Sequence, residues 1–225
     1  MKATYLRDTP LPGLLDPFGE AWSRVNTETL ALSGTPSALQ PTAAVRVAFP
    51  EGTIGAIRSA ELAVAHNGSE IAFRLRWADA SMNTAAAGED DTLFPDGAAL
   101  LFPAAPGAPL MSMGAPGKPV TAWYWRADEP DRGRHVSAQG LGSSDTLDRE
   151  LVKVAGVHRD GHWHVVIARA LAVAKGPATV RLVPGQATPF SLAIWEGGHR
   201  ERAGIKAFAM GQHDGWHELI LDPQA

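Results

Sequence analysis

Two tight-turn signals, each between alternating apolar segments, constrain the fold of this chain most. SAELAVAHNGSEIAFRLRWAD (59–79) contains two alternating runs joined by Asn67-Gly68, and KVAGVHRDGHWHVVIARAL (153–171) contains two more around Asp160-Gly161. Alternation with period two predicts strands that bury one face, and Asn-Gly suits a type I′ turn, whose two central residues need positive φ. Both segments are therefore predicted to be antiparallel hairpins.

Further strands are predicted where short apolar runs are bounded by Gly and Pro. They are AVRVAFP (44–50), GAALLFPA (97–104), KPVTAWYWRAD (118–128), PFSLAIWEG (189–197) and GWHELILDP (215–223). Two long connections, 80–97 and 126–153, interrupt this pattern, and loops of that length are usually functional or disordered. Many short strands with few helices predict an all-β fold, an antiparallel β-sandwich with long loops at one end.

The domain organisation is predicted from length and local composition. Residues 1–40 are rich in Pro, Ser and Thr, and we expect them to form an arm packed on the core, with a weakly amphipathic piece at 16–25. Residues 41–225 are predicted to form a single domain, because β-sandwiches of this size commonly fold as one unit.

Composition excludes several classes of function. The chain has no cysteine, which rules out disulfides, thiolate ligands and the Cys-x-x-Cys-His attachment of c-type haem. The net charge of −4 and the scattered Lys and Arg argue against a nucleic-acid partner. No apolar stretch approaches the roughly 18 residues needed for a membrane span, and the first residues lack the apolar core of a secretory signal.

Common hydrolase, zinc-peptidase and nucleotide-binding motifs are absent from the sequence. His162 and His164 share one strand face and suit a metal pair, but beside a turn an exposed polar face is the favoured interpretation. The acidic group Glu89, Asp90, Asp91 and Asp96 could bind calcium, yet its spacing does not match an EF-hand, so a solvated acidic loop is preferred.

The stretch MSMGAPGKPVTAWYWRAD (111–128) presents two methionines from a Gly/Pro-rich loop that leads into an aromatic strand. A thioether is a soft neutral ligand that suits haem iron. The alternative is that Met111 and Met113 fill a gap in the core, as methionines commonly do. The spacing alone leaves both interpretations open.

Three segments carry a resemblance to a known family: DTLFPDGAALLFP (91–103), MGAPGKPVTAWYWRAD (113–128) and FSLAIWEGGHRERAGIKAFAMGQHDGWHELIL (190–221). They resemble the b-haem (γ) subunit of the ethylbenzene dehydrogenase, dimethyl sulfide dehydrogenase, selenate reductase and chlorate reductase group, which are complexes of the type II dimethyl sulfoxide reductase family. The similarity extends over about residues 45–221. It implies a β-sandwich with a haem b pocket at one end.

The resemblance also implies the site residues. The iron ligands would be the methionine of the Met-Gly motif, Met113, and the lysine that follows ERAGI, Lys206. Met111 is the fallback if the loop register differs. A lysine binds a metal only as the neutral amine, so its pocket must depress its pKa. Pocket-wall or core residues would be Trp123, Trp125, Trp195 and Phe208, and propionate partners would be Arg132, Arg134, Arg200 and Arg202.

The function implied is electron transfer without catalysis. A molybdenum catalytic subunit and an Fe–S subunit would form a heterotrimer with this chain, and its haem would exchange electrons with a soluble cytochrome or another redox carrier. Family members work outside the cytoplasm, so a periplasmic location is expected, although no signal is visible and a cytoplasmic location stays open.

Two alternatives remain at the level of sequence. One is a non-haem, carbohydrate-binding-like module, in which Trp125, Trp163 or Trp216 would lie on an open surface and Lys206 would contact solvent. The other is a haem-less assembly subunit with the same fold. The presence of both Met113 and Lys206 weighs against the second alternative.

Overall fold

The computed structural model describes residues 1–34, 36, 38, 42–48, 55–85, 94–173, 179–201, 205–211 and 213–223. Strands dominate these residues, and the helices are short. The strands are β1 Lys2–Tyr5, β2 Thr27–Ala31, β3 Ser59–His66, β4 Glu70–Ala78, β5 Gly97–Pro103, β6 Val120–Arg126, β7 Glu129–Ala138, β8 Ser144–Asp148, β9 Lys153–Arg159, β10 His162–Ala170, β11 Ala187–Trp195, β12 Ile205–Lys206 and β13 His217–Leu221. The helices are α1 Leu11–Leu15, η1 Glu20–Arg24, α2 Ala43–Ala48 and η3 His213–Gly215.

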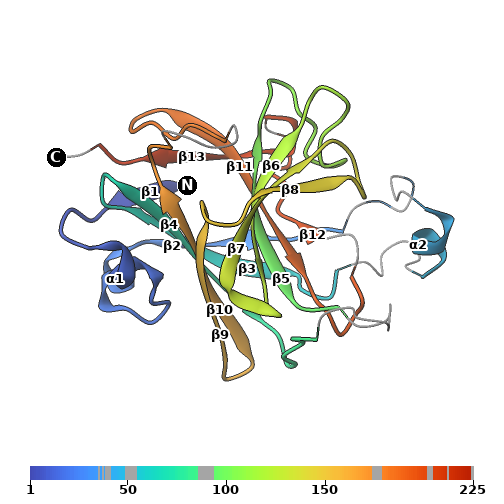
Figure 1. Cartoon of the computed structure of the whole chain (residues 1–225), viewed down its shortest axis with the longest axis horizontal. Helices are drawn as coiled ribbons and strands as arrows, with labels where there is room; N and C mark the ends of the chain where they lie inside the picture. The colour runs from blue at the N-terminus through green and yellow to red at the C-terminus, as the bar shows by residue number, and fades with distance from the viewer. Residues whose placement is uncertain are drawn as a thin grey trace.

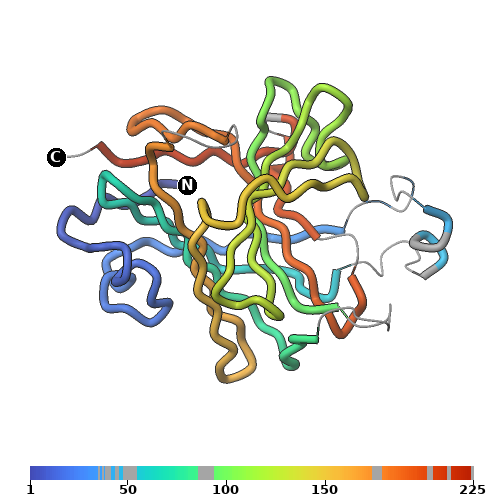
Figure 2. Tube along the Cα trace, viewed as in Figure 1, coloured from blue at the N-terminus to red at the C-terminus, as the bar shows by residue number. Residues whose placement is uncertain are grey.

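The strands form a β-sandwich, which confirms the predicted fold class. They follow one another in the order β8-β7-β6-β5-β11-β13-β1-β3-β4-β10-β9, with β12 beside β11 and β2 beside β3. This long sheet folds over, so that the half containing β3, β4 and β10 faces the half containing β5, β6 and β11 (Figures 1 and 2). Strand β1 pairs in parallel with β13 and β3 and joins the halves, and the other pairs are antiparallel.

The space between the halves is filled by large side chains that alternate along the strands. Phe73 of β4 contacts Phe102 and Trp123 edge to face, with ring centroids 6.3 and 5.7 Å apart, and Trp77 meets Trp125 at 6.1 Å. These aromatic rings are buried. Edge-to-face packing of this kind adds to the stabilisation from burial alone. The sandwich therefore has one aromatic core between its two halves.

Both predicted hairpins are present, and their turns differ. Asp160 (φ 51°) and Gly161 (φ 69°) both have positive φ between β9 and β10, as a type I′ turn requires. Between β3 and β4, Gly68 has φ 93° but Asn67 does not have positive φ. The Asn67 Oδ1 instead accepts hydrogen bonds from the backbone N–H groups of Ser69 and Glu70, at 2.9 and 2.7 Å. The type I′ prediction for Asn67-Gly68 was therefore wrong in turn type.

Two strand predictions were wrong. The segment 44–50 was predicted as a strand, but helix α2 covers Ala43–Ala48. Its alternation comes from two valines among alanines, and alanine has the highest helix propensity. The connection 126–153 was predicted to lack strands, but it contains β7 and β8. Strand β8 is mostly exposed at the end of the strand order, so its sequence carries almost no apolar alternation.

The outer face of the first half of the sandwich is covered by the N-terminal residues. Its surface consists mainly of small side chains, Ala63, Ala65, Ala72, Val166 and Ala168. Trp22 of η1 packs on them together with Leu14 of α1, and the Trp22 Nε1 donates to the Asp16 carbonyl at 3.0 Å. Strands β1 and β2 from the same N-terminal residues extend the sheet itself.

Candidate functional site

The outer face of the second half is also lined by small residues. Ala193 of β11 lies opposite Ala99 of β5, which lies opposite Tyr124 of β6. Residues opposite one another in antiparallel strands project to the same side of the sheet. Ala122 and Leu101 continue this surface in the next row. We call this surface, formed by Ala99, Leu101, Ala122, Tyr124 and Ala193, the alanine face.

Lys206 lies at one edge of the alanine face. In the short strand β12 it pairs with Ala193, and on its other side its backbone exchanges hydrogen bonds of 2.9 Å with Ser33 in both directions. The side chain is 1% exposed, and this burial lowers the pKa of Lys206 to about 8. The solvent-exposed Lys206 expected for a carbohydrate-binding-like module is therefore not found. A buried amine with a depressed pKa is closer to the neutral form that can bind a metal.

Met113 contributes to the cover of the same face. Its partly buried side chain packs against the cluster that contains Ala99, Ala122 and Ala193. The loop conformation is tightly held: Met113 has φ 58°, its N–H donates to the Leu110 carbonyl at 3.1 Å, and its carbonyl accepts from Gly140 at 2.9 Å. A left-handed non-glycine residue is uncommon and is often found at functional positions.

The glycine after Met113 is required by its surroundings. Gly114 has φ 86°, and a Cβ at this position would lie 2.6 Å from the Ala138 carbonyl oxygen. The Met-Gly pair is therefore a structural unit, because only glycine allows the loop to approach β7 so closely. Met111, two residues earlier, is 40% exposed.

The aromatic residues divide between the two faces of β6. Trp123 and Trp125 point into the inter-sheet core and are fully buried there, on the side opposite to Lys206 and Met113. Tyr124 points to the alanine face, where its ring meets Trp195 at 5.2 Å, and Phe208 packs on the same cluster. Trp123 and Trp125 were predicted as pocket-wall or core residues, and they are core residues, whereas Tyr124 was not among the predicted contacts. Alternation along a strand places Tyr124 on the face opposite to Trp123 and Trp125. Which of these faces lies inside the sandwich depends on how the two halves pack together.

The predicted arginines are dispersed. Arg134 lies opposite Tyr124 in the strand row and pairs with Glu129 at 2.5 Å. Arg132 is exposed on β7, and Arg200 is exposed with φ 60° after the turn at Gly197-Gly198. Arg202 lies outside the described residues. Arg134 is thus the predicted arginine that the strand register brings next to the alanine face.

The histidine pair and the acidic group noted in the sequence lie in different environments. His162 and His164 are partly exposed beside the turn, with ring centroids 6.4 Å apart, in agreement with an exposed polar face. Asp96 is fully buried, so the solvated-loop interpretation was wrong for it, while Glu89, Asp90 and Asp91 lie outside the described residues. Asp96 instead lies with Asp79 and Glu196 in a buried carboxylate cluster that the sequence analysis missed.

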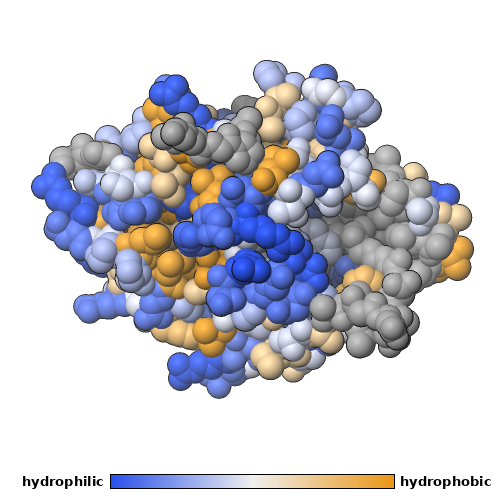
Figure 3. All heavy atoms as spheres, viewed as in Figure 1, coloured by the Kyte–Doolittle hydropathy of each residue, from blue (hydrophilic) through white to orange (hydrophobic). Residues whose placement is uncertain are grey.

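The surface needed for stacking on sugars is not found on the tryptophans named for that alternative. Trp125, Trp163 and Trp216 are 0%, 2% and 4% exposed, and Lys206 is buried as well. The visible face in Figure 3 mixes polar and apolar residues rather than presenting one continuous apolar surface. Among the described residues, no helix has the length and apolar character needed to cross a membrane.

Comparison with known sequences agrees with the resemblance. Residues 20–150 match the family described as ethylbenzene dehydrogenase. The chlorate reductase subunit gamma of Ideonella dechloratans is 36% identical over 160 residues, which are 71% of this chain and 64% of that protein. The dimethylsulfide dehydrogenase subunit gamma of Rhodovulum sulfidophilum is 31% identical over 159 residues, 68% of this chain and 56% of that protein.

A third relative carries a cofactor in its name. It is a protein of Haloferax mediterranei, provisionally named respiratory nitrate reductase heme subunit ORF7, and it is 27% identical over 198 residues, 88% of this chain and 66% of that protein. The chain thus spans 56% to 66% of the length of these three relatives.

Solved structures agree on the fold. A family 9 carbohydrate binding module from Caldicellulosiruptor kristjanssonii in complex with cellotriose superposes with a TM-score of 0.53 at 12% identity, covering 100% of this chain and 94% of that one. The same kind of module in complex with glucose gives 0.50 at 11% identity, covering 100% and 96%. At such low identity the likeness concerns the β-sandwich alone. The family match over residues 20–150 and the identity to the chlorate reductase subunit together show that the chain belongs to the ethylbenzene dehydrogenase family.

Proposed function

We propose that this chain is a non-catalytic electron-transfer subunit that binds haem b on the alanine face, with Met113 and Lys206 as the axial ligands of the iron. The relatives named above are gamma or heme subunits of reductases and dehydrogenases, which supports the class of function. The finer assignment of ligands rests on this chain's own residues. Haem would supply one-electron chemistry when bound.

Lys206 is the observation that carries the proposal. A fully buried lysine is rare, because removing the ammonium charge from water is costly, and it is retained where its amine has a task. Here the side chain lies on the same sheet face as Ala193 and beside the cluster to which Met113 belongs. One buried amine and one thioether at the edges of a surface of small side chains form a donor set that fits a flat apolar cofactor once the amine has lost its proton.

The chain's residues have separate roles in this proposal. The small side chains of the alanine face allow other groups to approach the sheet closely, and Tyr124, Trp195 and Phe208 supply apolar contacts around it. The Met113-Gly114 turn fixes the backbone from which the thioether extends, and the paired backbone of β12 does the same for the Lys206 side chain. Rigid ligands favour electron transfer because little has to move when the charge of the iron changes.

The partners follow from the same class of function. A molybdenum catalytic subunit and an Fe–S subunit would exchange electrons with this chain, and a soluble cytochrome or other carrier would be the second electron partner. A periplasmic site of action belongs to the proposal as well. Arg134, beside Tyr124, is the proposed partner of a propionate group.

Absorption spectroscopy tests the ligand assignment. The purified protein is incubated with hemin, and spectra are recorded oxidised and dithionite-reduced for the wild type, Met113→Ala and Lys206→Ala. We expect six-coordinate b-type bands in the wild type and altered or lost bands in both variants. Met111→Ala is the matched control, because Met111 lies in the same loop but is 40% exposed, and it should keep the wild-type spectrum. A wild type that binds no haem, or ligand variants with unchanged spectra, would overturn the assignment.

A further inference from the structure

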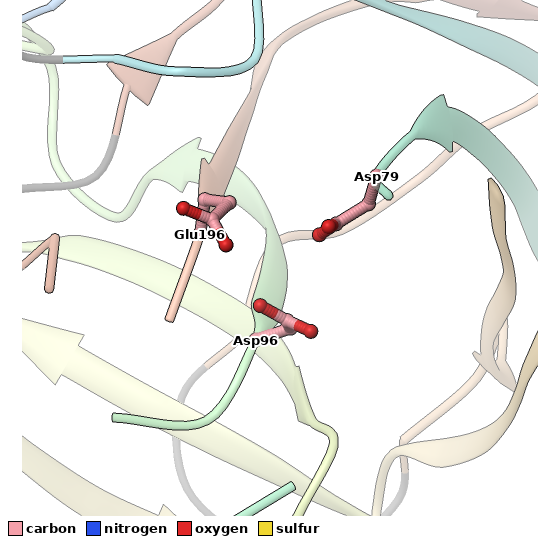
Figure 4. Close-up of side chains that lie close together, drawn as sticks. All are labelled: Asp79, Asp96 and Glu196. Carbon is pink, nitrogen blue, oxygen red and sulfur yellow. The ribbon is translucent and has the colours of Figure 1, made fainter. Parts of the chain in front are cut away.

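A second group of buried polar side chains lies at one end of the sandwich, where strands of both halves end. Asp79 follows β4, whereas Asp96 precedes β5 and Glu196 follows β11. Figure 4 shows their carboxylates directed into a common space. One carboxylate oxygen from each residue lies within 4.8 Å of the others, and the three residues are 5%, 0% and 8% exposed. The cluster therefore bridges the two halves of the fold.

Backbone and indole N–H groups orient the carboxylates. Asp96 accepts from the N–H groups of Gly197 and Asn83, both at 2.8 Å, and from Trp163 Nε1 at 2.9 Å. Glu196 accepts from the N–H groups of Gly198 and His199, at 3.0 and 2.6 Å. The turn depends on glycine, because a Cβ on Gly197 would lie 2.0 Å from the Phe94 carbonyl oxygen. These contacts fix two carboxylates in place without neutralising either.

Asp79 is incompletely satisfied. Its Oδ1 accepts from the Ser81 N–H at 3.0 Å, but its Oδ2 is buried and has no hydrogen-bond partner. The single Ser81 hydroxyl proton is within reach of three acceptors, Asp79 Oδ1, Asn83 Oδ1 and Glu196 Oε1, at 3.2, 2.9 and 3.4 Å. Since one proton can serve only one of them well, the cluster contains more acceptors than donors.

Among the described residues, no ion pair provides a counter-charge to the cluster. All ion pairs found within the described residues involve other carboxylates. A buried carboxylate oxygen without a donor, in a cluster of three carboxylates, is costly. A bound cation would remove that cost.

The chemistry of the ligands indicates the kind of cation. Calcium takes oxygen ligands at about 2.3–2.6 Å, so two ligands on opposite sides of the ion lie up to about 5 Å apart. Magnesium demands near-ideal octahedral geometry at about 2.1 Å and usually keeps several waters, so a closed cluster of three protein carboxylates suits it less well. The three ligand residues are all carboxylates, with no histidine, which argues against zinc.

We propose that Asp79, Asp96 and Glu196 form a calcium site that ties the two halves of the sandwich together at this end. The Asn83 side-chain oxygen, which shares the Ser81 hydroxyl, is a neutral further ligand in reach of the cluster. Next to the site, the Glu196 N–H donates to Glu201, whose other carboxylate oxygen accepts from the Ala56 N–H. The site is separate from Met113 and Lys206, and its test needs no haem.

Calcium binding is measured on the full haem-free chain after removal of metals with EDTA. Calorimetric titration with CaCl₂ and thermal unfolding in calcium or EDTA give affinity and stability. Terbium is a second probe, because the Trp163 indole, hydrogen-bonded to Asp96, is placed to sensitise its luminescence. The variants are Asp79→Asn and Glu196→Gln. Asp145→Asn, on the exposed strand β8, is the control with the same change of charge.

The expected result is one calcium ion per chain, a higher unfolding temperature in calcium than in EDTA, and terbium emission that calcium suppresses. Asp79→Asn and Glu196→Gln should weaken binding on the order of tenfold or more. In EDTA, Asp79→Asn should unfold at or above the wild-type temperature, since a like charge has been removed. Asp145→Asn should behave as the wild type.

Two results would overturn the proposal. The first is a wild type with no calcium heat and the same unfolding temperature in calcium and EDTA, which would leave a carboxylate cluster that holds a proton instead. The second is an Asp79→Asn protein destabilised equally in calcium and EDTA, which would mark a purely structural role. Neither result bears on the haem spectra.

Discussion

The two outer faces of the sandwich can be compared residue by residue, because both consist of alternate small side chains on paired strands. On the first half, Ala65, Ala72 and Ala168 lie under Trp22 and Leu14, which are purely a packing cover. On the second half, Ala99, Ala122 and Ala193 lie beside Met113, Tyr124 and the Lys206 strand. The underlying surfaces are alike, whereas the residues around them differ in chemistry.

This difference shows where function lies in such a fold. Because alanine side chains are small, other parts of the chain or a ligand can approach such a surface closely. The alanines themselves do not determine which of these covers the sheet. The first face has an apolar cover from the chain's own N-terminus, which stabilises the fold. The second has a buried amine and a constrained thioether at its edges, which cost stability and are suited to binding a metal. Substitutions on one face, with the other face unchanged, can therefore separate stability from haem binding.

The largest effect on stability is expected from the cover of the first face. Trp22 is 2% exposed, so Trp22→Ala should lower the free energy of unfolding by about 3–5 kcal/mol, because it leaves a cavity above Ala65 and Ala168. Urea denaturation measures this loss. Trp22→Phe, which keeps most of the ring volume, should lose less. Haem uptake should remain as in the wild type for both variants, and its loss would show that the two faces are not independent.

A smaller, pH-dependent effect is expected from Lys206 in the haem-free protein. Its pKa is lowered from 10.5 to about 8 in the fold, so below pH 8 the native state contains a buried charge that burial disfavours. Between pH 8 and 10.5 the unfolded chain binds more protons, so the free energy of unfolding should rise, by roughly 3 kcal/mol across the window. Lys206→Met should lack this rise and be more stable than the wild type near pH 7.

Urea denaturation at several pH values between 7 and 10.5 measures this difference. Lys2→Met, an exposed lysine of β1, serves as the control and should follow the wild-type profile. If the wild type and Lys206→Met showed parallel profiles, Lys206 would not carry the buried charge in solution.

The smallest effect on stability is expected from enlarging one alanine on each outer face. The two substitutions should nevertheless differ most clearly in their effect on haem binding. Ala193 and Ala168 are both fully buried, one on each outer face. Leucine at either position should cost about 1–3 kcal/mol by overpacking. Ala193→Leu should also abolish haem uptake, because it fills the proposed haem-binding surface, while Ala168→Leu should retain it. Equal haem binding by the two variants would contradict the location proposed for the site.

Much of the fold could be predicted from local sequence. Alternation and the Asn67-Gly68 and Asp160-Gly161 turns predicted the hairpins β3–β4 and β9–β10, because register and turn chemistry act over a few residues. Strand β8 and helix α2 were not predicted, because the apolar residues in these two segments do not follow a pattern that indicates their secondary structure. An exposed edge strand has no buried face, and two valines among alanines suit a strand or a helix equally.

The sequence by itself determined the strand-rich class, the parity that separates Tyr124 from Trp123 and Trp125, and the Met-Gly turn, since each depends on near neighbours in the chain. Only the tertiary structure decided which face is inside, that Lys206 is buried beside Ala193, and that Asp79, Asp96 and Glu196 meet at one end. These contacts join residues far apart in sequence. Burial and charge environment are properties of the packed halves, and no local pattern specifies them.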